Sequence, residues 1–543
     1  MSRAAFPAMP TAAEQPISMP PPAPAGPDSR PTTRRRAVIL GLELALLAAV
    51  FAFSVALRSP NLDRPLSEHH EWLTAHSLMV MQIWWEDGAW DAKFTQRMNY
   101  PRQADKYINN AAMSLYGHYL PHDANGNFYY MSHPPMAMVA PYAVFRALGV
   151  RPDVRPLQIF GLAVHLLCAL AVFVLVRTAD PTGNSLNGGA VLGGAWYLLL
   201  PANLWFHSNV YYTEIFAQLP FLMVALVAIL CLRRLERRAD VGATWLLALA
   251  AASAFAVFSE WLGVLAAGAV AAYALWKALS SPAYLKIVAA AALAGGFAMA
   301  LFVLQYASQI GLRPFIMHLA GKFYFRAGLI EVPMELAGFD LGTIAQHFTL
   351  GAGAIFLLLL LLLACFKTTP AQVLRGERGL MVYLLATPPL LHHLLLLHFT
   401  TEHDYSILKS TPFLVVTGGL LWNELQRRGG FAGWHRRSVF ALSLLALSWM
   451  SVGGYRDYAY ARFPRYYQQD GEIIARTAKD DEVVFAMMHG EPRPQLLFYA
   501  GRNIRKVGSV EQAKEWLRDS ESKATKGIVF VNYDERKIVR FER

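Results

Sequence analysis

The first apolar run of the chain reads Arg34-Arg-Arg-Ala-Val-Ile-Leu-Gly-Leu-Glu-Leu-Ala-Leu-Leu-Ala-Ala-Val-Phe-Ala-Phe-Ser-Val-Ala-Leu57. About twenty apolar residues are what an α-helix needs to cross a bilayer core of roughly 30 Å. Similar runs follow near 157–176, 188–206, 215–232, 284–304, 350–366, 379–399, 407–424 and 438–453. The pattern predicts a mostly α-helical polytopic membrane protein of about 11–13 helices.

The composition agrees with a membrane protein, because a mean hydropathy of +0.30 and 55% apolar residues exceed the values of ordinary soluble domains. Two further apolar stretches are less regular. The stretch 134–149 is short and starts at Pro134-Pro135, so we expect it to cross the bilayer only in part or to re-enter. The stretch 243–277 is too long for one helix and is interrupted at Ser259-Glu260, which predicts two short helices.

Basic residues flank the apolar runs and account for much of the net charge of +11 at pH 7. The clusters are Arg34–Arg36, Arg233–Arg238, Lys367–Arg378, Arg427-Arg428 and Arg436-Arg437. Such clusters are typical of cytoplasmic loops beside membrane helices. The pattern predicts a cytoplasmic N-terminus, and it argues against a nucleic-acid partner because topology already explains the charge.

Following the chain from a cytoplasmic start gives two long outer loops, 58–133 and 309–348. We expect residues 34–455 to form the membrane domain of a multi-pass protein in a bacterial inner membrane. Residues 1–33 are rich in Pro and Ala and are expected to be a disordered cytoplasmic tail. Residues 456–543 are expected outside, in the periplasm.

The C-terminal segment 456–543 has a different character from the membrane domain. Strand-like runs begin at Glu482, Gly527 and Lys537, while Ser509 with Gln512 forms a capping box that opens a helix. Strands that alternate with short helices predict a small extracytoplasmic α/β domain.

Four polar clusters lie next to apolar runs, all on the face predicted to be outside. They are Glu68-His69-His70-Glu71, Ser132-His133-Pro134-Pro135, Thr213-Glu214 and Glu402-His403-Asp404-Tyr405. Ionisable groups at the edge of the hydrocarbon are costly and commonly mark a functional site. The pattern therefore favours an enzyme that works at the outer membrane surface.

The order of these clusters resembles the GT-C superfamily of membrane glycosyltransferases, and most closely the group of protein O-mannosyltransferases and lipid A aminoarabinose transferases. The matching segments are Glu68-His-His-Glu71-Trp-Leu-Thr-Ala75, Tyr130-Met-Ser-His133-Pro134-Pro135, Thr213-Glu214, His403-Asp404-Tyr405 and Leu496-Leu-Phe-Tyr499-Ala-Gly-Arg502. The resemblance covers 37–543. It implies a GT-C-like fold and an inverting transfer of a sugar from a polyprenyl-phosphate donor to a glycan, lipid or protein acceptor.

Such a transfer needs a carboxylate that takes the proton of the acceptor. Glu71, Glu68 and Glu214 are the candidates for this catalytic role, and Glu71 is favoured because it lies four residues before Ala75, as in the family. The group often has two adjacent acids where this chain has His70-Glu71, so the choice between Glu68 and Glu71 stays open. The plain alternative is that these carboxylates are simply solvated.

The leaving phosphate needs cationic partners. The candidates for binding the donor phosphate are His133, Lys322, Arg326, His318, Arg313, His403 and Lys409. His318, Lys322 and Arg326 are spaced four residues apart, so they share one face if 314–327 is helical. The alternative for that face is a basic helix that lies on anionic lipid headgroups.

No cofactor is expected, and a divalent cation held by His69, His70 and a nearby carboxylate is the lesser alternative, because adjacent histidines rarely serve one ion without further ligands. The main rival function is a polytopic lipid or solute transporter or flippase. It predicts repeated helices with matching Gly or Pro breaks in each half, and the chain has no convincing repeat. A non-catalytic assembly partner and a lipid-linked ligase or polymerase are further rivals.

Overall fold

The computed structural model describes residues 33–543 apart from 102–103, 105, 107, 109–113, 116–117, 120, 180–184, 238–239, 330–339, 365–375, 430–433, 460–464, 521, 523 and 533–535. The tail predicted over 1–33 lies outside this part, except for Thr33. So does the middle of the predicted outer loop 309–348.

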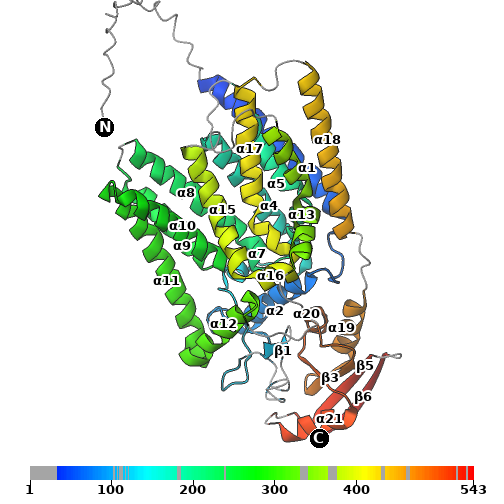
Figure 1. Cartoon of the computed structure of the whole chain (residues 1–543). Coiled ribbons are helices and arrows are strands. Elements are labelled where there is room, and N and C mark those ends of the chain that lie inside the picture. Colours follow the sequence, from blue (N-terminus) through cyan, green and yellow to red (C-terminus); the bar gives the residue numbers. More distant parts are fainter. Residues whose placement is uncertain are drawn as a thin grey trace, which may run out of the picture.

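Long helices run side by side and form the upper body of the molecule in Figure 1. They are α1 Thr33–Arg58, α4 Val154–Ala179, α8 Gln218–Glu236, α10 Trp261–Ala278, α11 Leu285–Ile310, α13 Leu341–Ala364, α15 Glu377–Leu395, α17 Thr411–Arg427 and α18 Trp434–Ala459. Shorter apolar helices pack among them: α3 Met136–Leu148, α5 Gly188–Leu199 and α9 Ala243–Val257. Among the described residues, six segments are long and apolar enough to cross a membrane. The polytopic α-helical fold is confirmed.

The stretch 243–277 is divided into two helices, as the sequence predicts, although the second of them is long enough to cross a membrane. The stretch 243–277 forms α9 and α10, and the break falls at Glu260, which caps α10 by accepting a hydrogen bond from the Leu262 amide at 2.6 Å. The helix that follows Pro134-Pro135, α3, has only 13 residues. At 1.5 Å per residue it is too short to span the hydrocarbon alone.

Close helix packing in the bundle depends on glycines. A Cβ at Gly189 in α5 would lie 2.1 Å from the Gly419 carbonyl oxygen in α17, so only glycine allows this approach of the two backbones. The Asn423 side chain also reaches across, because its Oδ1 accepts a hydrogen bond from the Gly189 amide at 2.8 Å. These contacts fix α17 against α5.

Short elements lie at the end of the helix bundle that is nearer to the C-terminal unit, and several of them are labelled in Figure 1. They are α2 Glu71–Asp87, α6 Pro201–Phe206, α7 Thr213–Phe216, α12 Leu312–Ala327, α16 Leu397–Glu402, η5 Asp404–Lys409, and the hairpin of β1 Ser114–Leu115 and β2 His118–Tyr119. The helix predicted over 314–327 is therefore present as α12. All four polar clusters belong to this end.

A small α/β unit follows the membrane helices. Its helices are α19 Tyr466–Thr477, α20 Pro494–Ala500 and α21 Val510–Asp519, and its strands are β3 Glu482–Met488, β4 Ile504–Lys506, β5 Lys526–Asn532 and β6 Arg536–Glu542. The sheet order is β4-β3-β5-β6, with β3 parallel to β4 and β5, and with β6 antiparallel to β5. The Ser509 side chain accepts from the Gln512 amide, as the capping box predicts.

The α/β unit is docked on the first outer loop. The Leu66 amide donates to the Tyr499 hydroxyl at 2.7 Å, and the Gln495 side chain donates to the Ser67 carbonyl at 2.6 Å. Tyr499 and Gln495 belong to α20, which also packs on α2. The loop segment around Ser67 is therefore held from outside by the C-terminal unit.

Candidate functional site

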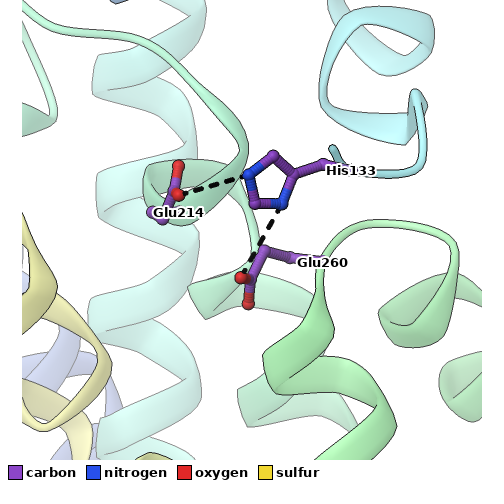
Figure 2. A group of neighbouring side chains, drawn as sticks. All are labelled: His133, Glu214 and Glu260. Atoms are coloured by element: carbon purple, nitrogen blue, oxygen red, sulfur yellow. Dashed lines mark ion pairs between the residues drawn. The ribbon is translucent and has the colours of Figure 1, made fainter. Parts of the chain in front are cut away.

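Three fully buried side chains meet at the end of the bundle that is nearer to the C-terminal unit (Figure 2). His133 Nε2 lies 3.7 Å from Glu214 Oε1, and His133 Nδ1 lies 3.9 Å from Glu260 Oε1. One ligating atom from each residue lies within 4.8 Å of the others. We call His133, Glu214 and Glu260 the central triad.

Local structure presents each member of the triad. His133 precedes the proline pair that opens α3, and its carbonyl accepts a hydrogen bond from the Gln96 side chain at 2.9 Å. Glu214 is the second residue of α7, where the Thr213 hydroxyl donates to its Oε2 at 2.8 Å. Glu260 occupies the break between α9 and α10. Each acid is thus anchored by one oxygen and turns the other toward His133.

Cationic side chains surround the central triad. Arg326 Nη1 in α12 lies 3.2 Å from His133 Nε2, and Lys409 Nζ at the end of η5 lies 3.4 Å from Glu260 Oε1. Lys322 Nζ lies 4.8 Å from the centre of the Tyr130 ring. Two carboxylates therefore face three cations, so the cluster carries one unit of positive charge when all five are ionised.

Lys322 is poised to change its charge near neutral pH. The side chain is almost fully buried, and this burial, together with the nearby charge of Arg326, lowers the pKa of the Lys322 ammonium to about 7. An anion beside Lys322 would favour its charged form.

A pocket of about 420 Å³ adjoins these cations. Its apolar walls come from α10, α12 and the end of α15: Trp261, Val264, Leu265, Ile316, Leu319, Ala320, Phe323, Tyr324, Leu395 and Leu396. Lys322, Arg326 and His392 also line it. The pocket suits a molecule that has an apolar body and an anionic end.

The structure gathers part of the site predicted from the sequence. Glu214, His133, Lys322, Arg326 and Lys409 meet around the triad, although they come from distant parts of the chain. The other predicted residues have different surroundings.

Glu71 is buried in the first outer loop, where it holds the loop together. Its Oε1 accepts from Arg64 at 2.6 Å, and its Oε2 accepts from both the amide and the hydroxyl of Ser67 at 2.7 Å. Burial raises the pKa of the Glu71 carboxyl to about 7, against the opposing effects of Arg64 and Ser67. Glu68 is exposed and accepts from the Tyr466 hydroxyl at 2.6 Å. These contacts tie both acids to the loop and the C-terminal unit.

His69 and His70 face a carboxylate from a late helix. His69 Nε2 lies 3.3 Å from Asp404 Oδ2, and His70 Nε2 lies 3.0 Å from Asp404 Oδ1. Burial would raise the pKa of Asp404, but hydrogen bonds from the two histidines hold it well below its usual range. The His403 ring stacks on Tyr405. This His69–Asp404–His70 clamp joins the first outer loop to η5.

Arg313 and His318 precede Lys322 and Arg326 in α12. Arg313 is exposed near the start of α12, and His318 is half-buried in the middle of that helix. Neither lines the pocket. Only the last third of α12 brings its cations to the triad.

Two members of the cluster were not among the predicted site residues. They are Glu260, which was used only as a helix break, and His392. In the structure His392 Nε2 lies 3.5 Å from Glu260 Oε1. An acid inside a long apolar stretch was the available signal for Glu260, because such a residue is costly there unless it is paired.

The central triad has the donor types that a divalent cation prefers, an imidazole nitrogen and carboxylate oxygens. However, Arg326 already lies against His133 Nε2, and Lys409 already lies against Glu260 Oε1. A metal ion would have to displace these two cations. The negative charge of the two carboxylates is thus balanced by cationic side chains of the protein itself.

No protein-family model and no curated protein matches the chain. Several solved structures are similar, and two of them hold a lipid phosphate. Oligosaccharyltransferase AglB from Archaeoglobus fulgidus, in complex with an inhibitory peptide and a dolichol-phosphate, gives a TM-score of 0.56 at 11% identity, over 90% of this chain and 69% of that chain. ArnT from Cupriavidus metallidurans, bound to undecaprenyl phosphate, gives a TM-score of 0.53 at 11% identity, over 91% of this chain and 93% of that chain.

Because only 11% of the aligned residues are identical, these structural similarities establish the fold alone. The chain shares the fold of these two proteins, and six segments among its described residues are long and apolar enough to cross a membrane. A structure of the Archaeoglobus fulgidus oligosaccharyltransferase in complex with Zn and sulfate also matches, with a TM-score of 0.54 at 10% identity, over 89% of this chain and 67% of that chain.

Proposed function

We propose that the chain is a glycosyltransferase that moves a sugar from a polyprenyl-phosphate donor to an acceptor at the outer face of a bacterial inner membrane. The observation that carries this proposal is the apolar pocket that has Lys322 and Arg326 in its lining, beside the central triad. A donor of this kind has an apolar chain, a phosphate and a sugar in that order. The pocket, the two cations and the triad follow the same order.

The charge of the cluster supports a donor with one phosphate. A sugar joined to a polyprenyl monophosphate is a phosphodiester with a single negative charge. Three cations and two carboxylates leave one unit of positive charge, which such a donor neutralises. Arg326 suits the phosphate because its guanidinium can give two parallel hydrogen bonds to one phosphate group.

Glu214 is the general base in this proposal. Its Oε2 is held by Thr213, while its Oε1 lies 3.7 Å from His133 Nε2, beyond hydrogen-bond distance, and can take a proton. Both oxygens of Glu260 have donors within 3.4 Å, from Leu262 and Lys409. Glu260 therefore holds Lys409, and Glu214 does the proton transfer.

In the reaction, the acceptor oxygen attacks the anomeric carbon of the sugar, and its proton goes to Glu214. The bond from that carbon to the phosphate oxygen breaks, and the electron pair leaves with the polyprenyl phosphate. Arg326 and Lys322 stabilise the charge that grows on this oxygen. The family resemblance implies inversion at the anomeric carbon. ArnT with undecaprenyl phosphate and AglB with dolichol-phosphate offer precedent for a lipid phosphate in this fold.

The test uses the purified chain in lipid nanodiscs with a panel of polyprenyl-phosphate sugars, and it measures release of polyprenyl phosphate. Arg326→Gln should lower turnover per enzyme at limiting donor by about 10–100-fold, because a charge-assisted hydrogen bond contributes about 1.5–3 kcal/mol. Arg313→Gln is the matched control, since it removes an exposed cation from the same helix.

Equal activity of the two variants would contradict the assignment of Arg326. Donor binding and transbilayer movement of the intact donor, without sugar release from any donor tested, would favour the lipid transporter or flippase instead.

A further inference from the structure

A second set of buried polar side chains lies inside the helix bundle. Its members are all completely buried: Arg58, His165, Tyr197, His207, Gln218 and Thr411. They come from α1, α4, α5, the segment after α6, α8 and the start of α17. Polar groups are costly in an apolar interior unless they are hydrogen-bonded, and those inside membrane domains commonly have a function.

Gln218 is the centre of this set. The Tyr197 hydroxyl donates to Gln218 Oε1 at 2.6 Å, and the Thr411 hydroxyl approaches the same oxygen at 3.3 Å. His207 Nε2 lies 3.3 Å from the Tyr197 hydroxyl and 3.4 Å from Gln218 Nε2. One side chain therefore links α5, α8 and α17.

A stack of two histidines supports His207. The rings of His165 and His207 are parallel within 2°, with their centroids 4.5 Å apart. His165 Nδ1 lies 3.1 Å from Arg58 Nη1, and His165 Nε2 lies 3.1 Å from the Tyr197 carbonyl oxygen. The backbone is also tight here, because a Cβ at Gly161 would lie 3.0 Å from the His207 carbonyl oxygen. His207 has little room to move.

The network meets the charged cluster at two points along the chain. Gln218 follows Glu214 by four residues, within the apolar segment Thr213–Glu236. Thr411 follows Lys409 by two residues, and its hydroxyl also donates to the Leu408 carbonyl at 2.9 Å. The Thr411 hydroxyl has one proton, which it shares between the Leu408 carbonyl and Gln218 Oε1, and its contact with Gln218 joins the segment that carries Glu214 to the segment that carries Lys409.

We infer that Tyr197, His207, Gln218 and Thr411 are positioning residues that set the place of Glu214 relative to Lys409 and, through Lys409, to Glu260. Buried hydrogen bonds such as those at Gln218 resist displacement of the elements that they join, because breaking one leaves a buried polar group without a partner. The kinetic part of this inference rests on the proposed function, whereas the coupling between the two segments does not.

The first test compares two variants of α17. Thr411→Val removes the hydroxyl that contacts Gln218. Thr417→Val is the control, since it removes a buried hydroxyl further along the same helix. We expect Thr411→Val to lower kcat about tenfold or more through misplacement of the base, with the donor KM unchanged because Lys322 and Arg326 are intact. Thr411→Ser should restore kcat.

The second test measures hydrogen–deuterium exchange in the same variants. Thr411→Val should speed exchange of the backbone amides in both 213–218 and 404–410, and Thr417→Val should leave them unchanged. Tyr197→Phe removes only a hydroxyl and serves as a second probe if Thr411→Val does not fold.

The possible outcomes distinguish the positioning network from the proposed function. Equal exchange in the Thr411 and Thr417 variants would overturn the positioning network, whether or not the protein transfers sugar. A parallel rise of KM with the fall of kcat would also overturn it. Absence of transfer by the unaltered protein would refute the proposed function alone, because the exchange data would still decide the coupling.

Discussion

Glu71 and Glu214 are both buried acids near the start of a helix, but their partners differ. Arg64 and Ser67 occupy both oxygens of Glu71, whereas Glu214 turns one oxygen toward His133 and the charged cluster. Family-like spacing favoured Glu71 as the base. The structure moves our proposal to Glu214, and the role of Glu71 in catalysis stays a prediction.

Replacing each acid with glutamine separates these alternatives. Glu214→Gln keeps the size of the side chain but loses its basicity, so sugar transfer should fall by about 10²–10⁴-fold with donor affinity unchanged. Glu71→Gln is the comparison and should change the thermal stability of the outer loop more than it changes kcat. The reverse result, with transfer lost only in Glu71→Gln, would return the base to the first outer loop.

Lys322 gives donor binding a pH dependence. Its ammonium has a pKa lowered to about 7 by burial and by Arg326, so the charged fraction falls as the pH rises through that value. Donor affinity should therefore weaken between about pH 6 and pH 8.5. Lys322→Arg keeps its charge over this range and should flatten the profile, as titration of the donor by calorimetry would show. A profile that is equally steep in Lys322→Arg would assign the effect to another group.

At the scale of elements, the His69–Asp404–His70 clamp joins the first outer loop to the start of a late helix. Asp404→Asn should free this junction, since a charged hydrogen-bonded partner is lost. We expect a loss of about 1–3 kcal/mol in unfolding free energy and faster hydrogen exchange in 66–72. Asp480→Asn is the control, because Asp480 is exposed on the C-terminal unit. No difference between the two variants would show that the clamp does not hold the loop.

Individual helices and their ends could be predicted from the sequence, because they depend on residues that are close together in the chain. The break at Glu260, the helix α12 and the capping box of α21 each follow from a few neighbouring residues. Which elements face one another depends on contacts between residues far apart in the chain. Glu260 meets Lys409 across 149 positions, and Arg326 meets His133 across 193. No periodicity reports such pairs, so the site was predicted only in part.

At the scale of the whole molecule, the candidate site and the C-terminal unit are expected on the same side of the membrane. The α/β unit contacts the first outer loop through Tyr499 and Gln495, so the two share a compartment. Reporter fusions after Arg237 and after Arg543 should therefore report opposite compartments, with the C-terminal fusion outside. Two cytoplasmic signals would contradict the orientation of the membrane domain and the placement of the site.

The most direct test of the central claim is an experimental structure of the chain in nanodiscs with a polyprenyl phosphate. We expect the phosphate to contact Arg326 and Lys322, and the first isoprene units to lie in the pocket between Trp261, Ile316 and Leu396. Density for the lipid elsewhere on the protein, with this pocket filled by side chains or by bulk lipid, would contradict the account.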